Sequence, residues 1–426
     1  RKGLQRFRRR TGSLFREERA KKLMNPSAAY AFVGRSVGAI SLLPTAAEER
    51  PLVIVGANEK LGDPRFAYRL PNLEVRAEDS TGFGNETEEG STELAVVGYA
   101  SHEGGVTAMC AAGGRSGSPI PEWVACGSDK GALSLYPVTW PSDKGGNSGS
   151  LAPTLGRPDA STGHGAPAFQ GFFDEATGAW AAKAEGKGVS PACGVAASGD
   201  GTRVALLREG GLLCVHAVAS LFASQAPPPL KALRVDALGA TALGWQSDGG
   251  QTLLTAGLEG LRLWDLSAPG TKAVLETGSR GAAPTALAAM GTRGDPWRCV
   301  TGTEDGGVVL WDLRKGTHAL ARLQAHSPGC AVRSLVSHPD DPSVVLCAGD
   351  DGNVVLLDLS SGGSDEKART VLAQSGGAIE SDLGFPPACV DLAFDAETNY
   401  LVGAFDNEAA ATLHRHPRLG RGARFA

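Results

Sequence analysis

The chain of 426 residues is 42% hydrophobic and 20% charged, which is enough apolar material for a large buried core. No run of 18 apolar residues occurs, so we expect no membrane insertion. The net charge of -5 is uneven: residues 1–24 carry ten basic and two acidic residues (+8), and the remainder carries 31 and 44 (-13). An acidic body argues against direct nucleic-acid binding.

The eight cysteines are spread along the chain without a Cys-x-x-Cys pair. Most lie in strand-like runs, so we expect buried free thiols in a reducing compartment. Zinc-ligand spacing is missing, as are the nucleophile elbow, the phosphate-binding loop and the His-Glu-x-x-His motif. The sequence therefore predicts no catalytic residues, no metal, no cofactor and no small-molecule substrate.

Residues 1–29 are predicted to form a basic flexible arm. A nuclear-import signal, a transit peptide and a phosphate-binding arm are its functional interpretations, and a solvated tail is the simpler alternative. The chain does not open with Met, and Met24 offers an alternative start. With that start, residues 1–23 would not belong to the native protein.

Two strand-rich units follow the arm. The first combines the apolar runs Tyr30–Leu43, Leu52–Gly56 and Phe66–Leu70, and the second spans Leu94–Val138. In the second, Asp129 lies in a glycine turn before an alternating apolar run. Alternation bounded by glycine turns predicts antiparallel strands.

Residues 139–188 interrupt this rhythm. They are rich in Gly, Ser, Pro and Ala, which predicts a low-complexity insertion. The insertion carries four aromatic residues, Phe169, Phe172, Phe173 and Trp180. These side chains could dock on a partner or pack on the parent fold, and the sequence leaves both possibilities open.

A repeated unit dominates the second half of the chain. Trp264-Asp265 recurs 47 residues later as Trp311-Asp312, and Asp305-Gly306 recurs 46 residues later as Asp351-Gly352. A glycine turn and a closing Trp-Asp at this period are typical of β-propeller blades. The units predicted after the insertion are 193–218, 239–266, 284–313, 325–359 and 390–414.

The count favours an all-β, seven-bladed WD40 β-propeller over residues 30–417. Seven blades need roughly 280–315 residues, whereas residues 30–417 number 388. Insertions at 139–188 and 361–385 account for most of the difference. Residues 418–426 form a basic tail. We expect Tyr30–Leu43 to pair beside the seventh unit, because that pairing would remove open sheet edges.

The recurring polar residues have a structural interpretation. In a propeller blade a His, a turn Asp and a strand Trp can form a buried hydrogen-bond chain. The residues assigned to blade structure are Asp129, Trp264, Asp265, Asp305, Trp311, Asp312, His326, Asp351 and Asp358. His326 and Asp351 resemble a catalytic dyad, but we expect a structural pair.

Three stretches resemble one known family. They are 301–317 with Leu323–His326 and Ser337–Pro342; Leu401–Ala409 with Thr412–His416; and the opening 30–44. Together they resemble the nucleoporin forty-three family, the small WD40 subunits of the Y-shaped outer-ring complex of the nuclear pore. The closing Asp-Asn-Glu-Ala-Ala and Arg-His residues are the more specific signal.

The resemblance implies a non-enzymatic scaffold subunit that contacts other nucleoporins, including an α-solenoid subunit. It also implies a place at the nuclear envelope and a role in nucleocytoplasmic and mRNA transport.

Two other function classes stay open. The run Trp311-Asp312-Leu313-Arg314 is similar to the adaptor-binding box of WD40 substrate receptors of cullin ubiquitin ligases. Arg314 would then be a partner contact that meets acidic groups. The other class is an enzyme acting through the propeller channel, for which no convergent acid, base or metal set is visible.

Overall fold

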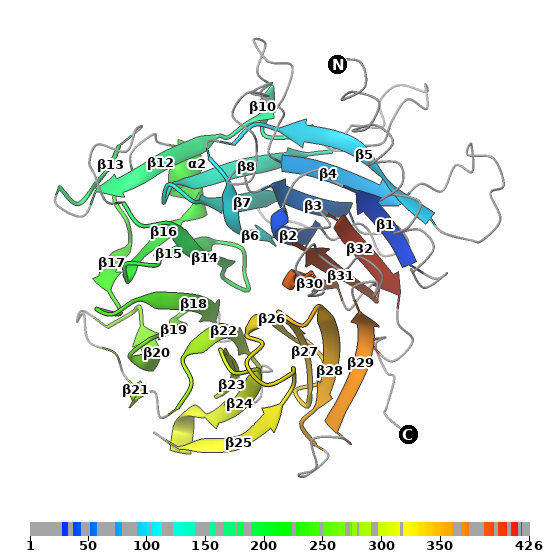
Figure 1. Ribbon diagram of the computed structural model, residues 1–426. Coiled ribbons are helices and arrows are strands. Elements are labelled where there is room, and N and C mark those ends of the chain that lie inside the picture. The colour runs from blue at the N-terminus through cyan, green and yellow to red at the C-terminus, as the bar shows by residue number, and fades with distance from the viewer. Residues whose placement is uncertain are drawn as a thin grey trace, which may run out of the picture.

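Most of the residues that the structure describes lie in antiparallel β-sheets grouped around a common centre (Figure 1). The computed structural model describes residues 28–32, 37–43, 52–57, 73–78, 92–102, 104–112, 122–140, 154–158, 165–174, 177–181, 189–223, 227–246, 250–268, 273, 275–278, 281–290, 297–315, 318–360, 368–374, 387–395, 399–406, 410–415 and 419. Among these residues the helical elements are α2 (Val218–Ala223) and the 3-10 helix η3 (Leu313–Lys315). No helix in this part of the chain is long and apolar enough to span a membrane. The prediction of an all-β fold is confirmed.

One ten-stranded sheet contains two four-stranded parts, which we call sheet one and sheet seven. The strands of sheet one follow in sequence order. They are β2 (Val37–Leu43), β3 (Leu52–Ala57), β4 (Leu73–Glu78) and β5 (Thr92–Ala100). The predicted run Phe66–Leu70 lies outside the described residues, and β4 is the strand paired with β3. Because β5 pairs with β4, the second unit begins after Ala100 and not at Leu94.

Sheet two includes part of the predicted insertion. Its strands are β6 (Val106–Ala112), β7 (Trp123–Ser128), β8 (Leu133–Thr139), β12 (Phe169–Asp174) and β13 (Ala179–Ala181), with β9 (Thr154–Leu155) also paired to β8. Two short strands, β10 (Arg157–Pro158) and β11 (Gly165–Ala166), connect this region to β5. The prediction that 139–188 is only a low-complexity insertion is therefore wrong, because its aromatic run supplies strand β12.

Sheets three to six have four strands each. Sheet three contains β14 (Ala192–Ala197), β15 (Arg203–Arg208), β16 (Leu212–Ala217) and β17 (Lys231–Arg234). Sheet four contains β18 (Ala240–Trp245), β19 (Thr252–Gly257), β20 (Gly260–Asp265) and β21 (Leu275–Gly278). Sheet five contains β22 (Pro284–Ala289), β23 (Arg298–Thr303), β24 (Gly307–Asp312) and β25 (Ala319–Gln324). Sheet six contains β26 (Val332–Ser337), β27 (Val344–Gly349), β28 (Asn353–Asp358) and β29 (Arg369–Gln374).

Sheet seven pairs the first described strand with the last. Sheet seven contains β30 (Cys389–Asp395), β31 (Tyr400–Phe405), β32 (Ala410–Arg415) and β1 (Ala28–Phe32). Strand β1 runs antiparallel to β32, with Ala28 opposite His414, and it also touches β5 in parallel. The predicted pairing beside the seventh unit is confirmed, although the paired strand ends at Phe32 and the later part of the run forms β2.

The first strands of these sheets surround the centre (Figure 1). Strands β2, β6, β14, β18, β22, β26 and β30 each contact the next in this order, and β30 contacts β2. Apolar clusters fill the space between neighbouring sheets, as where Trp123 and Phe169 meet Leu206. This arrangement is consistent with a β-propeller, and it leaves a cavity at the axis.

Candidate functional site

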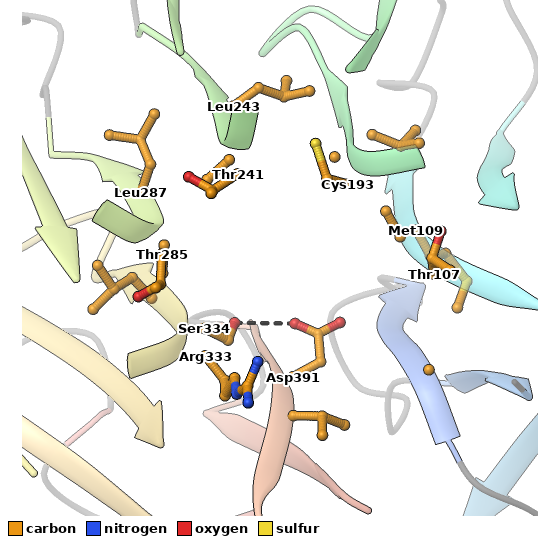
Figure 2. Close-up of a pocket in the computed structure, with 18 residues that line it drawn as sticks. Thr107, Met109, Cys193, Thr241, Leu243, Thr285, Leu287, Arg333, Ser334 and Asp391 are labelled. Atoms are coloured by element: carbon orange, nitrogen blue, oxygen red, sulfur yellow. Dashed lines mark hydrogen bonds between the residues drawn. The ribbon is translucent and has the colours of Figure 1, made fainter. Parts of the chain in front are cut away.

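The central cavity has a volume of about 200 Å³ and is lined by residues of the first strands (Figure 2). Each of these strands has a register shift near its start, which is typical of a β-bulge. The residue at each register shift lines the cavity, as Thr107, Thr241 and Thr285 do. The polar and sulfur-bearing side chains labelled in Figure 2 are those of Thr107, Met109, Cys193, Thr241, Thr285, Arg333, Ser334 and Asp391.

The hydroxyls of the three labelled threonines form hydrogen bonds within the fold. Thr107, Thr241 and Thr285 donate to backbone carbonyls of the following sheet, over oxygen–oxygen distances of 2.7, 2.9 and 2.6 Å. Each hydrogen bond ties one first strand to the next. These hydroxyls therefore stabilise the arrangement of the sheets.

Asp391 connects three of the first strands. Its carboxylate accepts hydrogen bonds from the Ser334 hydroxyl (3.0 Å), the Ile40 amide (3.0 Å) and the Leu392 amide (2.9 Å). Burial raises the pKa of Asp391 to about 6, against the lowering effect of these donors. The carboxyl group can hold a proton near neutral pH, and both of its oxygens are already occupied by donors from the fold.

The other reactive groups in the cavity, those of Cys193 and Arg333, are either neutral or paired within the fold. Burial raises the pKa of the Cys193 thiol to about 12, so this thiol is neutral at pH 7. Arg333 is paired with Asp350, at 2.5 Å from Nε to Oδ1. Within the described part of the chain, no group of three His, Cys, Asp or Glu side chains could hold a metal ion.

The predicted Trp-Asp pairs have the same geometry in sheets four and five. The indole N–H of Trp264 donates to the Thr255 hydroxyl at 2.9 Å, and that of Trp311 donates to the Thr301 hydroxyl at 2.9 Å. The aspartates that follow fix the next turn. Asp265 accepts from the Ser267 amide, Asp312 from the Arg314 amide and Asp358 from the Ser360 amide.

His326 and Asp351 form a buried pair in sheet six. Nδ1 of His326 lies 2.8 Å from Oδ1 of Asp351, and the Ser327 amide donates to the other carboxylate oxygen at 3.0 Å. Burial alone would raise the pKa of Asp351, but the hydrogen bonds from His326 and Ser327 hold it well below its usual range. Leu357 stands where sheets four and five have Trp, and Nε2 of His326 has no hydrogen-bond partner. The expected structural pair is thus present, but its hydrogen-bond chain does not continue to a Trp.

Two more predicted aspartates lie in turns between strands. Asp129 accepts from the Gly105 amide at 3.0 Å, and Asp305 accepts from the Thr303 hydroxyl at 2.6 Å. The Gly that follows Asp305 has φ of 87°, and its counterpart after Asp351 has φ of 69°. Since only glycine adopts these angles without strain, the recurring Asp-Gly is explained by the turn.

The four aromatic residues of the insertion lie in the core. Phe169, Phe172, Phe173 and Trp180 are 1%, 3%, 3% and 7% exposed. The indole of Trp180 packs edge-on against Phe169 and Phe173, with ring centroids 5.2 and 5.6 Å apart. Their burial favours packing on the parent fold over contact with a partner. Strands β12 and β13 carry them in sheet two, where Phe169, Phe173 and Trp180 share a core cluster with residues of sheet three.

Arg314, the remaining predicted partner contact, reaches the surface. Its side chain is 50% exposed, and its guanidinium pairs with Asp312 at 3.0 Å. This pairing lowers the pKa of Asp312. The Asp312 carboxylate fixes the position of the guanidinium at the end of sheet five.

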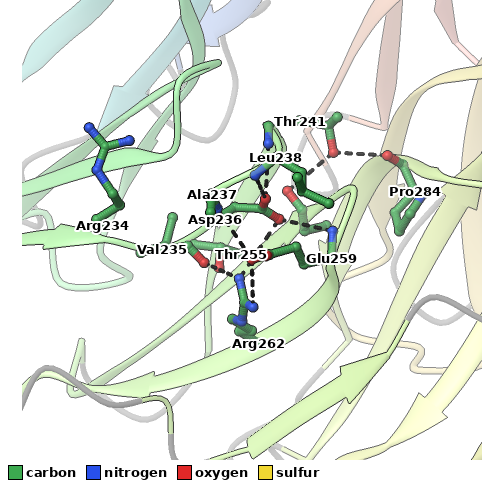
Figure 3. Close-up of polar contacts among 12 residues, drawn as sticks. Arg234, Val235, Asp236, Ala237, Leu238, Thr241, Thr255, Glu259, Arg262 and Pro284 are labelled. Carbon is green, nitrogen blue, oxygen red and sulfur yellow. Dashed lines mark hydrogen bonds and ion pairs between the residues drawn. The ribbon is translucent and has the colours of Figure 1, made fainter.

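Sequence reasoning missed two structural carboxylates, Asp391 and Asp236. Asp236 is 4% exposed and accepts hydrogen bonds from the amides of Leu238, Gly239 and Glu259 (Figure 3). For Asp391 the available signal was a charged residue within the apolar run of a first strand. For Asp236 the available signal was an aspartate just before a first strand. His326 has the corresponding position in sheet six.

No protein-family model and no curated protein matches this chain. Function is therefore inferred from the fold, the site geometry and the motifs of the sequence.

Proposed function

We propose that the chain is a seven-bladed WD40 β-propeller and a non-enzymatic scaffold subunit of the outer ring of the nuclear pore. It docks by its propeller on an α-solenoid nucleoporin and works at the nuclear envelope with the other subunits of the Y-shaped complex. The blade count is supported by the seven first strands, each of which contacts the next around the cavity. The three stretches that resemble the nucleoporin forty-three family support the identity of the scaffold.

The observation that carries the proposal is that the recurring polar residues form hydrogen bonds inside the sheets. The tryptophans, the turn aspartates and the His326–Asp351 pair each bond within the fold. Their recurrence therefore needs no catalytic explanation. Propeller faces are broad and their edges short, which suits protein docking.

Affinity purification of the tagged chain from its native cells tests this proposal. We expect outer-ring nucleoporins to be recovered in similar amounts to the tagged chain, and the tagged chain to lie at the nuclear rim. Recovery without any of these nucleoporins would refute the proposal.

The second candidate is a substrate receptor of a cullin ubiquitin ligase. It is favoured by one observation: Arg314 is half exposed and oriented by Asp312 at the end of sheet five. Under this function, Arg314→Ala abolishes co-purification of the ligase adaptor. Arg322→Ala is the matched control, because Arg322 is 41% exposed and paired with Asp305 in the same sheet. Equal adaptor recovery by the native chain and Arg314→Ala removes this candidate.

A further inference from the structure

Two exposed leucines form an apolar patch at one end of sheet four. Leu238, in the loop before β18, is 68% exposed, and Leu258, in the turn after β19, is 47% exposed. The Leu258 amide donates to the Gly239 carbonyl at 2.9 Å. A Cβ atom at Gly239 would lie 3.5 Å from Cδ1 of Leu258, so the Leu258 side chain lies over the residue next to Leu238. We call these two side chains the leucine patch.

A buried polar network holds the loop of the leucine patch in place (Figure 3). Asp236 accepts from the amides of Leu238 and Gly239, at 2.9 Å each, and lies 3.8 Å from the Arg262 guanidinium. Arg262 also pairs with Glu259 at 2.8 Å, and Glu259 accepts from the Ala237 amide at 3.2 Å. The leucines are thus displayed by a fixed loop, which lowers the entropy cost of binding.

The surroundings of the leucine patch are acidic. Glu209 and Glu304 are exposed on the turns of sheets three and five. The Glu209 carbonyl accepts from the Ala240 amide at 2.9 Å, which places the turn of sheet three beside sheet four. The Glu304 amide donates to the Ala283 carbonyl at 3.0 Å, and the next residue, Pro284, accepts from the Thr241 hydroxyl of sheet four at 2.9 Å. The loops and turns at this end of sheets three to five carry five carboxylates, Glu209, Asp236, Glu259, Glu304 and Asp305. Three guanidiniums, those of Arg234, Arg262 and Arg322, lie beside them, which leaves a balance of -2.

We propose that the leucine patch is a docking surface for a basic segment of a partner protein, one that carries apolar side chains between Lys or Arg residues. Burial of the two leucines supplies the apolar contact, and the flanking carboxylates select cationic over anionic segments. The inference deepens the proposed scaffold function. It depends on that function for one assumption only, that the propeller docks partner proteins.

Fluorescence anisotropy of labelled amphipathic peptides tests the docking surface on the full chain. The probes are a leucine–lysine peptide and a leucine–glutamate peptide with the same leucine pattern. We expect the chain to prefer the leucine–lysine peptide, and the double substitution Leu238→Ser and Leu258→Ser to weaken its binding by about tenfold or more. Glu209→Lys with Glu304→Lys should remove the preference for the basic peptide.

The matched control is Leu230→Ser with Leu320→Ser, because these leucines are 52% and 39% exposed in other parts of the chain. The control variant should bind like the native chain, and circular dichroism should show every variant folded. Equal binding by the leucine-patch variant, an equal loss in the control, or a preference for the leucine–glutamate peptide would overturn the inference.

Purification of the same variants separates this inference from the proposed function. Recovery of outer-ring nucleoporins by both the native chain and the leucine-patch variant leaves the scaffold function standing and removes the docking surface. Leucine-dependent peptide binding without recovery of any nucleoporin leaves the docking surface standing and removes the scaffold function.

Discussion

The Ile40 amide donates to the Asp391 carboxylate at 3.0 Å, across 351 residues of chain. The other oxygen of that carboxylate accepts from the Ser334 hydroxyl at 3.0 Å. One buried side chain therefore joins the first strands of sheets six, seven and one. Strand β1 pairs with β32 of sheet seven and also with β5 of sheet one, so sheets seven and one are connected both by Asp391 and by β1.

The carboxyl group of Asp391 makes stability depend on pH. Burial raises its pKa from 3.8 to about 6, so the folded state binds the proton more tightly than the unfolded chain. The stabilisation is complete below about pH 4 and is lost as the pH rises through about 6. Asp391→Asn removes this titration. We expect the native chain to lose about 2 kcal/mol more than Asp391→Asn between about pH 4 and about pH 7.

Urea unfolding monitored by tryptophan fluorescence measures this difference at each pH. Asp395→Asn is the control, because Asp395 is an aspartate of the same strand. The control should keep the pH dependence of the native chain. The same pH dependence in Asp391→Asn would show that Asp391 does not titrate in the folded protein.

Asp351 should contribute in the opposite direction. Hydrogen bonds from His326 and Ser327 overcome the effect of burial and lower the pKa of Asp351, so its stabilisation is present above about pH 4 and lost as the pH falls below that value. Asp351→Ala should cost about 1–3 kcal/mol at neutral pH, because it leaves His326 without a partner. Asp358→Ala, at the turn after β28, should cost less. Thermal unfolding of both variants makes the comparison, and equal losses would contradict a special role for the His326–Asp351 pair.

Trp180 should be essential for sheet two. Trp180→Ala removes its contacts with Phe169 and Phe173 and the hydrogen bond from its indole to His216 at 3.2 Å. We expect a loss of about 3–5 kcal/mol in the free energy of unfolding. Trp297→Ala removes an indole that is 43% exposed and should have a small effect. Similar losses in the two variants would show that the insertion does not contribute to the core.

The repeated units were predictable because their signals are local. The Asp-Gly turns and the strand tryptophans recur at fixed spacing, and each makes its hydrogen bonds within one sheet. The outermost strands escaped prediction because they mix polar and apolar side chains: β25 reads Ala-Leu-Ala-Arg-Leu-Gln, and its first four residues are exposed. Strand β12 was hidden inside a Gly-rich, Ser-rich segment whose composition indicates a loop.

The candidate site was less predictable than the fold. The role of Asp391 depends on Ile40 and Ser334, which come from other sheets, and no local pattern shows that their donors meet one carboxylate. The exposure of Leu238 and Leu258 likewise depends on how the loop at Asp236 is folded. Such residues become functional candidates only when the tertiary contacts are known.

The pairing of the two chain ends can be tested by a disulfide. Ala29 in β1 lies directly opposite Leu413 in β32, and Cβ atoms of directly opposite residues are about 4.5–5.5 Å apart. The double substitution Ala29→Cys and Leu413→Cys should therefore form an intramolecular disulfide on mild oxidation and raise the melting temperature.

The register control is Ala29→Cys with Ala411→Cys, because Ala411 lies opposite Ala31 and is displaced from Ala29 by two residues. Diagonal neighbours are about 7–8 Å apart, so this pair should oxidise poorly. Non-reducing peptide mapping distinguishes the new disulfide from the native cysteines, most of which are buried. Equal oxidation of both pairs would contradict the register between β1 and β32. Failure of both pairs to oxidise would contradict the closure of sheet seven by the N-terminal strand.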